Sequence, residues 1–177
     1  MERLKMTMQT SDNHAPARHA QAARQLVFNL GDEFYAIPVL KVREIIRLLE
    51  ITPIPQMPPF ILGVINLRGK IIPVLDLRLR FGLAQAQTTQ STCIVVAHIK
   101  SPAGNTINMG LVVDGVEDVL NISPEDIEET PLFGAQLNTE FVPRIARVKG
   151  RVVALLDLDH LLLADPLETI NQSIPMP

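Results

Sequence analysis

The chain has 177 residues, of which 47% are hydrophobic and 20% charged, and it carries a net charge of −3. This composition is typical of a compact globular protein, and the slight acidic excess argues against nucleic acid as a partner. No apolar run approaches the roughly 20 residues of a membrane helix, and the N-terminus lacks the apolar core of a secretory signal. With one cysteine, Cys93, no intramolecular disulfide can form, so we expect a cytoplasmic protein that does not insert into membranes.

The first predicted elements are short strands. Apolar residues alternate along Gln25–Leu30, and a turn at Gly31-Asp32 leads into a second strand at Glu33–Val39. The pattern of Val42–Leu48 fits either a strand or a helix, and we favour the strand. Ile51–Phe60 contains four prolines and is predicted to be an extended connector, because proline fixes φ and lacks an N–H group.

The segment from Gly63 to Gly82 has the clearest local signals. An apolar run ends at Arg68-Gly69-Lys70, where the glycine can adopt the positive φ of a tight turn. Ile71–Leu75 is a second apolar run, short and rich in β-branched residues, which predicts a buried strand. Asp76 is then placed to cap a helical turn at Leu77–Phe81.

The second half of the chain repeats this alternation of short strands and turns. A polar link at Gln85–Ser91 separates it from the first half, and the acidic run Glu125–Glu129 is predicted to be an exposed turn. Asp157 is placed to cap a last helix at Leu158–Ala164. The predicted strands are Thr92–Ile99, Ile107–Val113, Val116–Leu120, Phe141–Val148 and Arg151–Leu156. Many short strands with regular turn signals indicate a barrel or a sandwich.

Two internal similarities indicate a duplicated architecture. Gly150 and Asp157 follow Gly69 and Asp76 by 81 residues in each case, within similar apolar surroundings. A second pattern, in residues 36–46, recurs 74 residues later. We therefore predict two similar β subdomains that differ in the lengths of their internal loops.

The sequence offers little catalytic chemistry. The four histidines and the cysteine lack the spacing of a metal site, and there is no glycine-rich phosphate loop or nucleophile motif. Asp76 and Asp157 occupy equivalent places, whereas catalytic carboxylates need different environments, so helix capping is their favoured role. We expect a protein that is not an enzyme and has no metal or cofactor.

Three segments carry a resemblance to a known family. They are LVFNLGDEFYAIPVLKVREI, PPFILGVINLRGKIIPVLDLRLRFG and GLVVDGVEDVL. The chain resembles the CheW family of bacterial chemotaxis coupling proteins over about Gln25–Leu163, and the pattern of Asn66–Gly69, Pro73 and Asp76–Arg78 is highly specific to that family. Because the chain lacks kinase ATP motifs and room for a receiver domain, it is most similar to the stand-alone coupling protein.

The resemblance implies an all-β fold with short helices. Two SH3-like five-stranded β-barrel subdomains are expected to share a hydrophobic seam within a CheW-like domain at 24–165. The first subdomain is expected mainly at 34–90 and the second mainly at 92–156, with an exchange of terminal strands. Residues 1–23 and 166–177 are expected to be tails.

The resemblance also implies a function. A non-enzymatic adaptor is expected, which couples the cytoplasmic hairpin tips of chemoreceptors to the regulatory domain of the histidine kinase CheA and supports array assembly. It is expected to be a monomer when free and to be recruited to arrays at the inner face of the membrane. An adaptor of a non-flagellar pathway is an alternative; a small-molecule-binding β-barrel and a scaffold that self-associates through sheet edges are hypotheses from other classes.

Family roles can be assigned to matching positions. The resemblance assigns receptor binding to Val42, Glu44, Ile45 and Val119. It assigns kinase binding to Ile51, Ile54, Gly63, Arg68 and Phe133. The apolar members of the first set would also fit a core, and Phe133 would also fit a loop packed on its own subdomain. Arg68 is expected to pair with Glu44 or with a partner carboxylate.

One strand departs from the family pattern. Arg43, Ile46 and Arg47 make the edge of the expected receptor groove more basic and more apolar than in the family. This difference bears on which receptor is chosen, and it does not change the expected fold.

Overall fold

In the computed structural model the described residues are 23–84, 86–101, 103–131 and 140–161. They form mostly β-strands, joined by short helices. The elements in chain order, with η marking a 3₁₀ helix, are β1 (Ala23–Leu30), β2 (Glu33–Pro38), η2 (Val39–Lys41), β3 (Val42–Arg47), β4 (Ile61–Leu67), β5 (Lys70–Asp76), α2 (Leu77–Arg80), β6 (Cys93–Lys100), β7 (Thr106–Val113), β8 (Gly115–Ile122), η3 (Pro124–Asp126), β9 (Ile127–Glu129), β10 (Arg144–Val148), β11 (Arg151–Leu155) and η4 (Leu158–Leu161). No helix among the described residues is long and apolar enough to cross a membrane.

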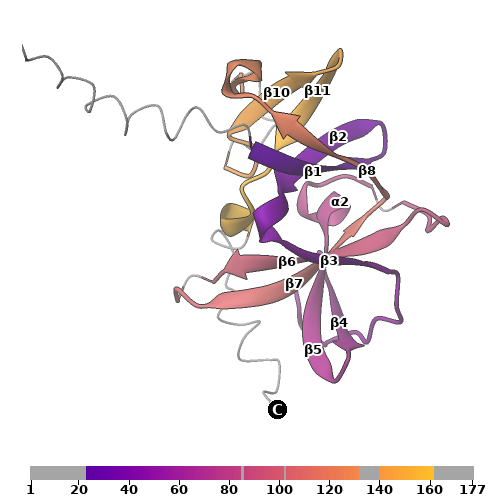
Figure 1. The fold of residues 1–177 in the computed structure, drawn as a ribbon. Helices are drawn as coiled ribbons and strands as arrows, with labels where there is room; N and C mark the ends of the chain where they lie inside the picture. The colour runs from indigo at the N-terminus through magenta and orange to yellow at the C-terminus, as the bar shows by residue number, and fades with distance from the viewer. Residues whose placement is uncertain (1–22, 85, 102, 132–139, 162–177) are drawn as a thin grey trace, which may run out of the picture.

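The strands form two sheets that make up two SH3-like β subdomains, as predicted (Figure 1). The six-stranded sheet has the order β8-β1-β2-β11-β10-β9, and the five-stranded sheet has the order β3-β6-β7-β5-β4. Apart from β9, the two orders match strand for strand. Each sheet contains one parallel contact, in which Leu155 pairs with Ala36 in one and Val74 pairs with Gly110 in the other. These four residues are related by the offsets of 81 and 74, which confirms the predicted duplication.

The division of the chain between the subdomains differs from the predicted one. The six-stranded sheet contains β1 and β2 together with the later strands β8, β9, β10 and β11. The five-stranded sheet contains β6 and β7 together with the earlier strands β3, β4 and β5. The exchange is therefore larger than the predicted exchange of terminal strands. The parallel contacts produce it, because each joins a strand of one repeat to a strand of the other. β1 also begins at Ala23, inside the predicted tail.

Two equivalent hairpin turns confirm the predicted roles of the glycines. Arg68 and Gly69 have φ angles of 52° and 84°, and Lys149 and Gly150 have φ angles of 53° and 77°. Positive φ at both central residues is the signature of a type I′ turn, whose twist suits a two-residue hairpin. The two hairpins, β4–β5 and β10–β11, are thus built in the same way.

Both predicted aspartates begin a helical turn. The Asp76 side chain accepts hydrogen bonds from the backbone N–H groups of Arg78 and Leu79, at 2.9 and 3.4 Å, and so caps α2. The Asp157 side chain accepts one from the N–H of Asp159 at 3.2 Å at the start of η4. The described part of the predicted last helix is a 3₁₀ turn that extends to Leu161, and the rest lies outside the described residues.

Two details of the second repeat differ from the prediction. Ile127–Glu129 is a short strand, β9, rather than part of an exposed turn, because it pairs with β10 and packs Ile127 on the core. β10 begins at Arg144 and not at Phe141. Pro143 precedes it and has no N–H group to donate to a ladder, so Phe141 and Val142 are buried without being part of the strand.

The core has three parts. A shared core lies between the two sheets and takes side chains from both, including Leu26, Phe28, Ile37, Val95 and Leu111. A second cluster, which includes Val27 and Val153, belongs to the six-stranded sheet alone. A third, which includes Val74 and Val96, belongs to the five-stranded sheet alone. The shared core is the predicted hydrophobic seam.

Candidate protein-binding surfaces

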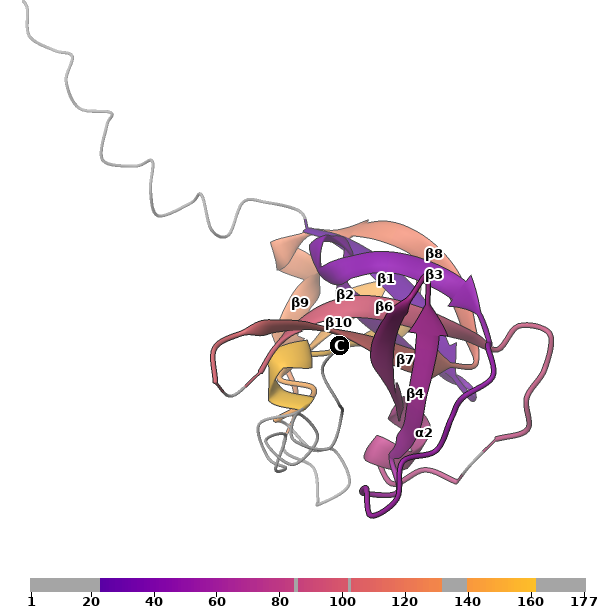
Figure 2. The ribbon, with the colours of Figure 1, turned by 90° about the horizontal axis from the view of Figure 1, so that it is seen from below.

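Two edge strands carry equivalent β-bulges. β3 and β8 each lie at the edge of a sheet, and Figure 2 shows them on the same side of the molecule. Arg43 is the extra residue in β3, and its two neighbours pair with consecutive residues of β6. Glu117 is the extra residue in β8, and its neighbours pair with consecutive residues of β1. Arg43 and Glu117 are themselves related by the offset of 74.

The bulges decide which side chains face the shared core. Because one residue is extra, Val42 and Ile45 lie on the same face of β3. Both pair with residues of β6 that belong to the shared core, and Val119 of β8 pairs with Leu26 of that core. Val42 is half-buried, whereas Ile45 and Val119 keep 44% and 38% of their surface exposed. Ile45 and Val119 are therefore apolar side chains at an open border of the shared core, not interior residues.

Glu44 lies on the other face of β3. It pairs with Val96, whose side chain belongs to the core of the five-stranded sheet. Its carboxylate is ion-paired with the guanidinium of Arg68 at the tip of the β4–β5 hairpin. The tip is braced by the Asn66 side chain, which accepts a hydrogen bond from the N–H of Gly69 at 2.9 Å. The structure thus brings Glu44 and Arg68 together, and it separates Glu44 from Ile45 and Val119.

The connector before β4 carries the other predicted kinase contacts. Thr52 and Val64 exchange two backbone hydrogen bonds of 2.8 and 2.9 Å, so the connector covers the edge of β4. Gly63 is buried beneath it with a φ of 145°, and a Cβ atom there would lie 2.1 Å from the carbonyl oxygen of Thr52. Ile51 packs on the core of the five-stranded sheet, and Ile54 is half-buried. Gly63 therefore lets the connector lie close to β4, and its assignment to the kinase contact stays a prediction.

Phe133, the remaining predicted contact, lies outside the described residues. Its assignment to the kinase interface stays a prediction.

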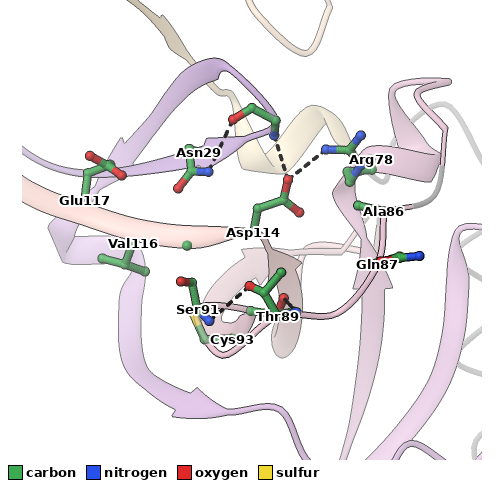
Figure 3. A pocket seen from close by; sticks show the side chains of 13 residues that line it. Asn29, Arg78, Ala86, Gln87, Thr89, Ser91, Cys93, Asp114, Val116 and Glu117 are labelled. Carbon is green, nitrogen blue, oxygen red and sulfur yellow. Dashed lines mark hydrogen bonds and ion pairs between the residues drawn. The ribbon is translucent and has the colours of Figure 1, made fainter.

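An ion pair joins the two subdomains at one side. Asp114, between β7 and β8, accepts hydrogen bonds from the Arg78 guanidinium at 2.8 Å and from the N–H of Gly31 at 2.6 Å (Figure 3). Arg78 also donates from Nε to the carbonyl oxygen of Ala84 at 2.8 Å. An open cavity of about 800 Å³ lies beside this pair. Arg78 thus fixes the turn from which β8 starts.

A second ion pair also joins the two subdomains. Asp159, which is 81 residues after Arg78, lies 3.4 Å from the ammonium group of Lys41 in η2. It also accepts a hydrogen bond from the N–H of Lys100 at 3.0 Å. The acidic and basic members are exchanged relative to the first pair. We call these two contacts, Arg78–Asp114 and Lys41–Asp159, the two clamps.

Arg80 links the repeats through their aromatic residues. Its guanidinium lies 4.6 Å from the ring centroid of Phe60 and 4.3 Å from that of Phe141, distances at which a cation is attracted to a ring face. Phe60 and Phe141 are equivalent residues, and their carbonyl oxygens accept hydrogen bonds from the N–H groups of Asp76 and Asp157. The offset of 81 between the two phenylalanines is a sequence signal of their equivalence, and the sequence has no comparable signal for Arg80.

Three titratable groups among the described residues, Tyr35, Asp76 and Cys93, have a raised pKa. No three or more His, Cys, Asp or Glu residues in the described part of the chain are grouped as a metal site would require. Burial raises the pKa of Asp76, whose oxygens are already used to cap α2, and burial raises the pKa of the Cys93 thiol. Burial and the neighbouring Glu33 raise the pKa of Tyr35. The perturbed groups are thus explained by packing.

Two joined β subdomains with apolar side chains exposed on edge strands are typical of a protein-binding module. The family model that describes the CheW-like domain matches residues 24–165. The chain belongs to this CheW-like family.

Similar proteins span most of the chain. The chemotaxis protein CheW of Rhizobium meliloti is 34% identical over 154 residues, which cover 86% of this chain and 96% of that protein. The chemotaxis protein CheW of Klebsiella aerogenes is 36% identical over 146 residues, covering 82% and 85% respectively. The crystal structure of the scaffolding protein TtCheW from Thermoanaerobacter tengcongensis is similar with a TM-score of 0.71 and 36% identity, covering 79% of this chain and 92% of that one.

Proposed function

We propose that the protein is a non-enzymatic adaptor that couples chemoreceptors to the histidine kinase CheA and supports the assembly of signalling arrays. The observation that carries the proposal is membership of the CheW-like family over residues 24–165, with relatives that are chemotaxis proteins. The adaptor works in the cytoplasm and is recruited to the inner face of the membrane by its receptors. It is a monomer when free.

The receptor is proposed to bind at the open border of the shared core. Val42, Ile45 and Val119 present an apolar surface there, formed by two strands of different subdomains. A helical hairpin lying along both strands would bury the exposed parts of Ile45 and Val119. Glu44 supports this surface from the opposite face of β3 through its ion pair with Arg68.

The regulatory domain of the kinase is proposed to bind the five-stranded sheet near β4. Ile51, Ile54 and Arg68 border this surface, and Gly63 allows the connector to lie close to β4. Because the receptor surface is formed by β3 and β8 and the kinase surface by β4 and its connector, both partners can bind at the same time. Simultaneous binding is what an adaptor needs.

The coupling function is tested by reconstitution. Purified protein is added to CheA and to membranes that carry chemoreceptors, and phosphotransfer is followed over a range of stoichiometries. We expect kinase output to change with the amount of adaptor and with receptor state. No change at any stoichiometry would contradict the coupling function.

The receptor surface is tested by a matched pair of variants. Ile45→Glu places a charge at the border of the shared core and should weaken binding of a receptor signalling fragment in titration calorimetry, because the apolar contact becomes a buried charge. Val152→Glu is the control, since Val152 is also exposed and apolar but lies on the β10–β11 hairpin. Equal effects of the two substitutions would show that the receptor does not bind at the border of the shared core.

Phe133 is proposed to join kinase and adaptor into extended arrays. Aromatic anchors often dominate interface affinity, so Phe133→Ala should abolish clusters seen by imaging in cells while pairwise kinase binding survives. Intact arrays, or loss of folding, would assign Phe133 to an idle surface or to the core.

A further inference from the structure

A small cavity at the tip of the β4–β5 hairpin carries an excess of positive charge. Its volume is about 80 Å³, and its charged and polar lining consists of Arg43, Glu44, Arg68, Lys70 and Asn108. Arg68 is ion-paired with Glu44. Arg43 and Lys70 are exposed and make no ion pair with any residue in the described part of the chain. Two cationic side chains at this cavity are therefore available to an external anion.

The matching place in the other subdomain has balanced charge. The offsets of 74 and 81 relate Arg43, Glu44, Arg68 and Lys70 to Glu117, Asp118, Lys149 and Arg151. There, Arg151 lies 3.9 Å from Glu117 and 4.2 Å from the ring centroid of Phe34. The positive excess is therefore a property of the first repeat and does not follow from the hairpin architecture.

The cavity is suited to a single carboxylate. Its apolar wall includes Ile72 and Val96, which belong to the core of the five-stranded sheet and lower the local polarity. A cavity of this size can hold several water molecules, so it has room for a carboxylate group. Cationic donors form short, strong hydrogen bonds with carboxylates, and the Asn108 amide adds a neutral donor.

We propose that this cavity receives an Asp or Glu side chain of the kinase's regulatory domain, held by Arg43 and Lys70 with the Asn108 amide. This inference rests on the proposed adaptor function. The cavity adjoins Arg68 and lies on the side of the five-stranded sheet's own core, whereas Ile45 and Val119 face the shared core. Glu44 keeps Arg68 in place and is not displaced. Complementary charge at such a site favours fast and specific association.

The test is titration calorimetry of the full chain with the regulatory domain of CheA from the same genome, at several salt concentrations. Arg43→Gln and Lys70→Gln should each weaken binding about two- to fivefold, as expected for partly exposed ion pairs. The double variant should also show a weaker dependence on salt. The affinity of the Lys70→Gln variant for a receptor signalling fragment should stay at the wild-type value.

Three controls separate charge from shape. Arg43→Lys and Lys70→Arg keep the positive charge and should retain binding. Arg151→Gln removes the equivalent cation of the other subdomain and should leave kinase affinity unchanged. If Arg43→Gln and Lys70→Gln bind the kinase as the wild type does, the carboxylate site is wrong, and the adaptor function is unaffected.

A second measurement does not depend on the kinase. If the wild type binds no regulatory domain at all, the proposed function is overturned, and with it the assigned source of the carboxylate. Titration with a polyglutamate peptide then tests the cavity itself through the NMR signals of the Asn108 side-chain amide. A saturable shift that is lost in the Arg43→Gln/Lys70→Gln variant supports an anion site, and the absence of a shift in the wild type overturns it.

Discussion

At the scale of single residues, Asp76 combines a stabilising and a destabilising effect. Its side chain satisfies two N–H groups at the start of α2, which would otherwise lack partners. Burial nevertheless raises its pKa, although both hydrogen bonds and Arg78 favour the charged form. The charge of Asp76 is therefore a cost that the cap has to offset.

The effect of this charge should appear as a pH dependence. Because the pKa is raised in the folded state, the stability that Asp76 contributes is complete below the pKa of the unfolded chain and is lost as pH rises through the folded value. Asp76→Asn keeps an oxygen acceptor without the charge, so the wild type should lose stability relative to this variant as pH rises from the acidic range. Urea unfolding at several pH values measures the difference.

Asp76→Ala is the companion to that experiment. It removes the acceptor and should cost about 0.5–2 kcal/mol in the acidic range, and less as pH rises. If the wild type instead gained stability over Asp76→Asn with rising pH, the hydrogen bonds would outweigh burial.

A second prediction at this scale concerns Gly63. Gly63→Ala places a Cβ atom 2.1 Å from the Thr52 carbonyl oxygen and keeps a φ that L side chains rarely adopt, so the connector must move. We expect a loss of about 1–3 kcal/mol in the free energy of unfolding. Gly69→Ala is the control, since Gly69 also has a positive φ but has nothing within 4 Å of a Cβ atom. Similar losses for both would show that backbone strain alone matters.

At the scale of elements, the local structure was largely predictable from the sequence. The hairpin at Arg68-Gly69, the cap at Asp76 and the alternation of β1 depend on neighbours a few residues away, and these features are confirmed. β9 was missed because its three residues form a strand through pairing with β10, not through their own pattern. A local acidic run gives no sign of such a distant partner.

The bulges likewise show that local sequence patterns could not predict which side chains form the candidate surface. The sequence indicated that Val42, Glu44 and Ile45 lie in one segment, and the structure shows that Glu44 faces away from the other two. One extra residue, Arg43, determines this arrangement, and a bulge has no clear signal in a run of apolar and charged residues.

The contact between β3 and the β4–β5 hairpin should affect binding more than folding. Charge reversal at Glu44 or at Arg68 breaks an ion pair that is partly open to solvent, so the free energy of unfolding should stay within roughly ±0.5 kcal/mol of the wild type. Binding of the receptor fragment or of the kinase domain should weaken, as measured by titration calorimetry. A loss of stability without a loss of affinity would make the pair a structural contact.

At the scale of the whole molecule, the exchange of strands joins the subdomains into one unit. Its basis lies in the parallel contacts of β5 with β7 and of β11 with β2, which link strands far apart in the chain. Local sequence patterns do not report such pairings, which is why the predicted boundary between the subdomains was wrong. The shared core and the two clamps then hold the sheets in one arrangement.

The strength of the first clamp can be measured by a double-mutant cycle. Arg78 and Asp114 have side chains that are only 18% and 24% exposed, so their coupling should lie in the range of about 0.5–3 kcal/mol. Arg78→Gln, Asp114→Asn and the double variant are compared by urea unfolding. The exposed pair of Arg147 and Glu128, at 69% and 48%, is the control and should couple by about 0.2–1 kcal/mol. Equal coupling energies in both cycles would show that the Arg78–Asp114 clamp stabilises the fold no more than an exposed surface ion pair does.

The exchanged charges of the two clamps make the repeats complementary. Lys41 and Arg78 belong to the first repeat, and their partners, Asp159 and Asp114, belong to the second. An assembly of two first repeats would bring Lys41 toward Arg78, and an assembly of two second repeats would bring Asp114 toward Asp159. Each repeat therefore selects the other and disfavours a copy of itself, as the subunits of a heterodimer do. The single chain behaves as a heterodimer whose two subunits are covalently joined.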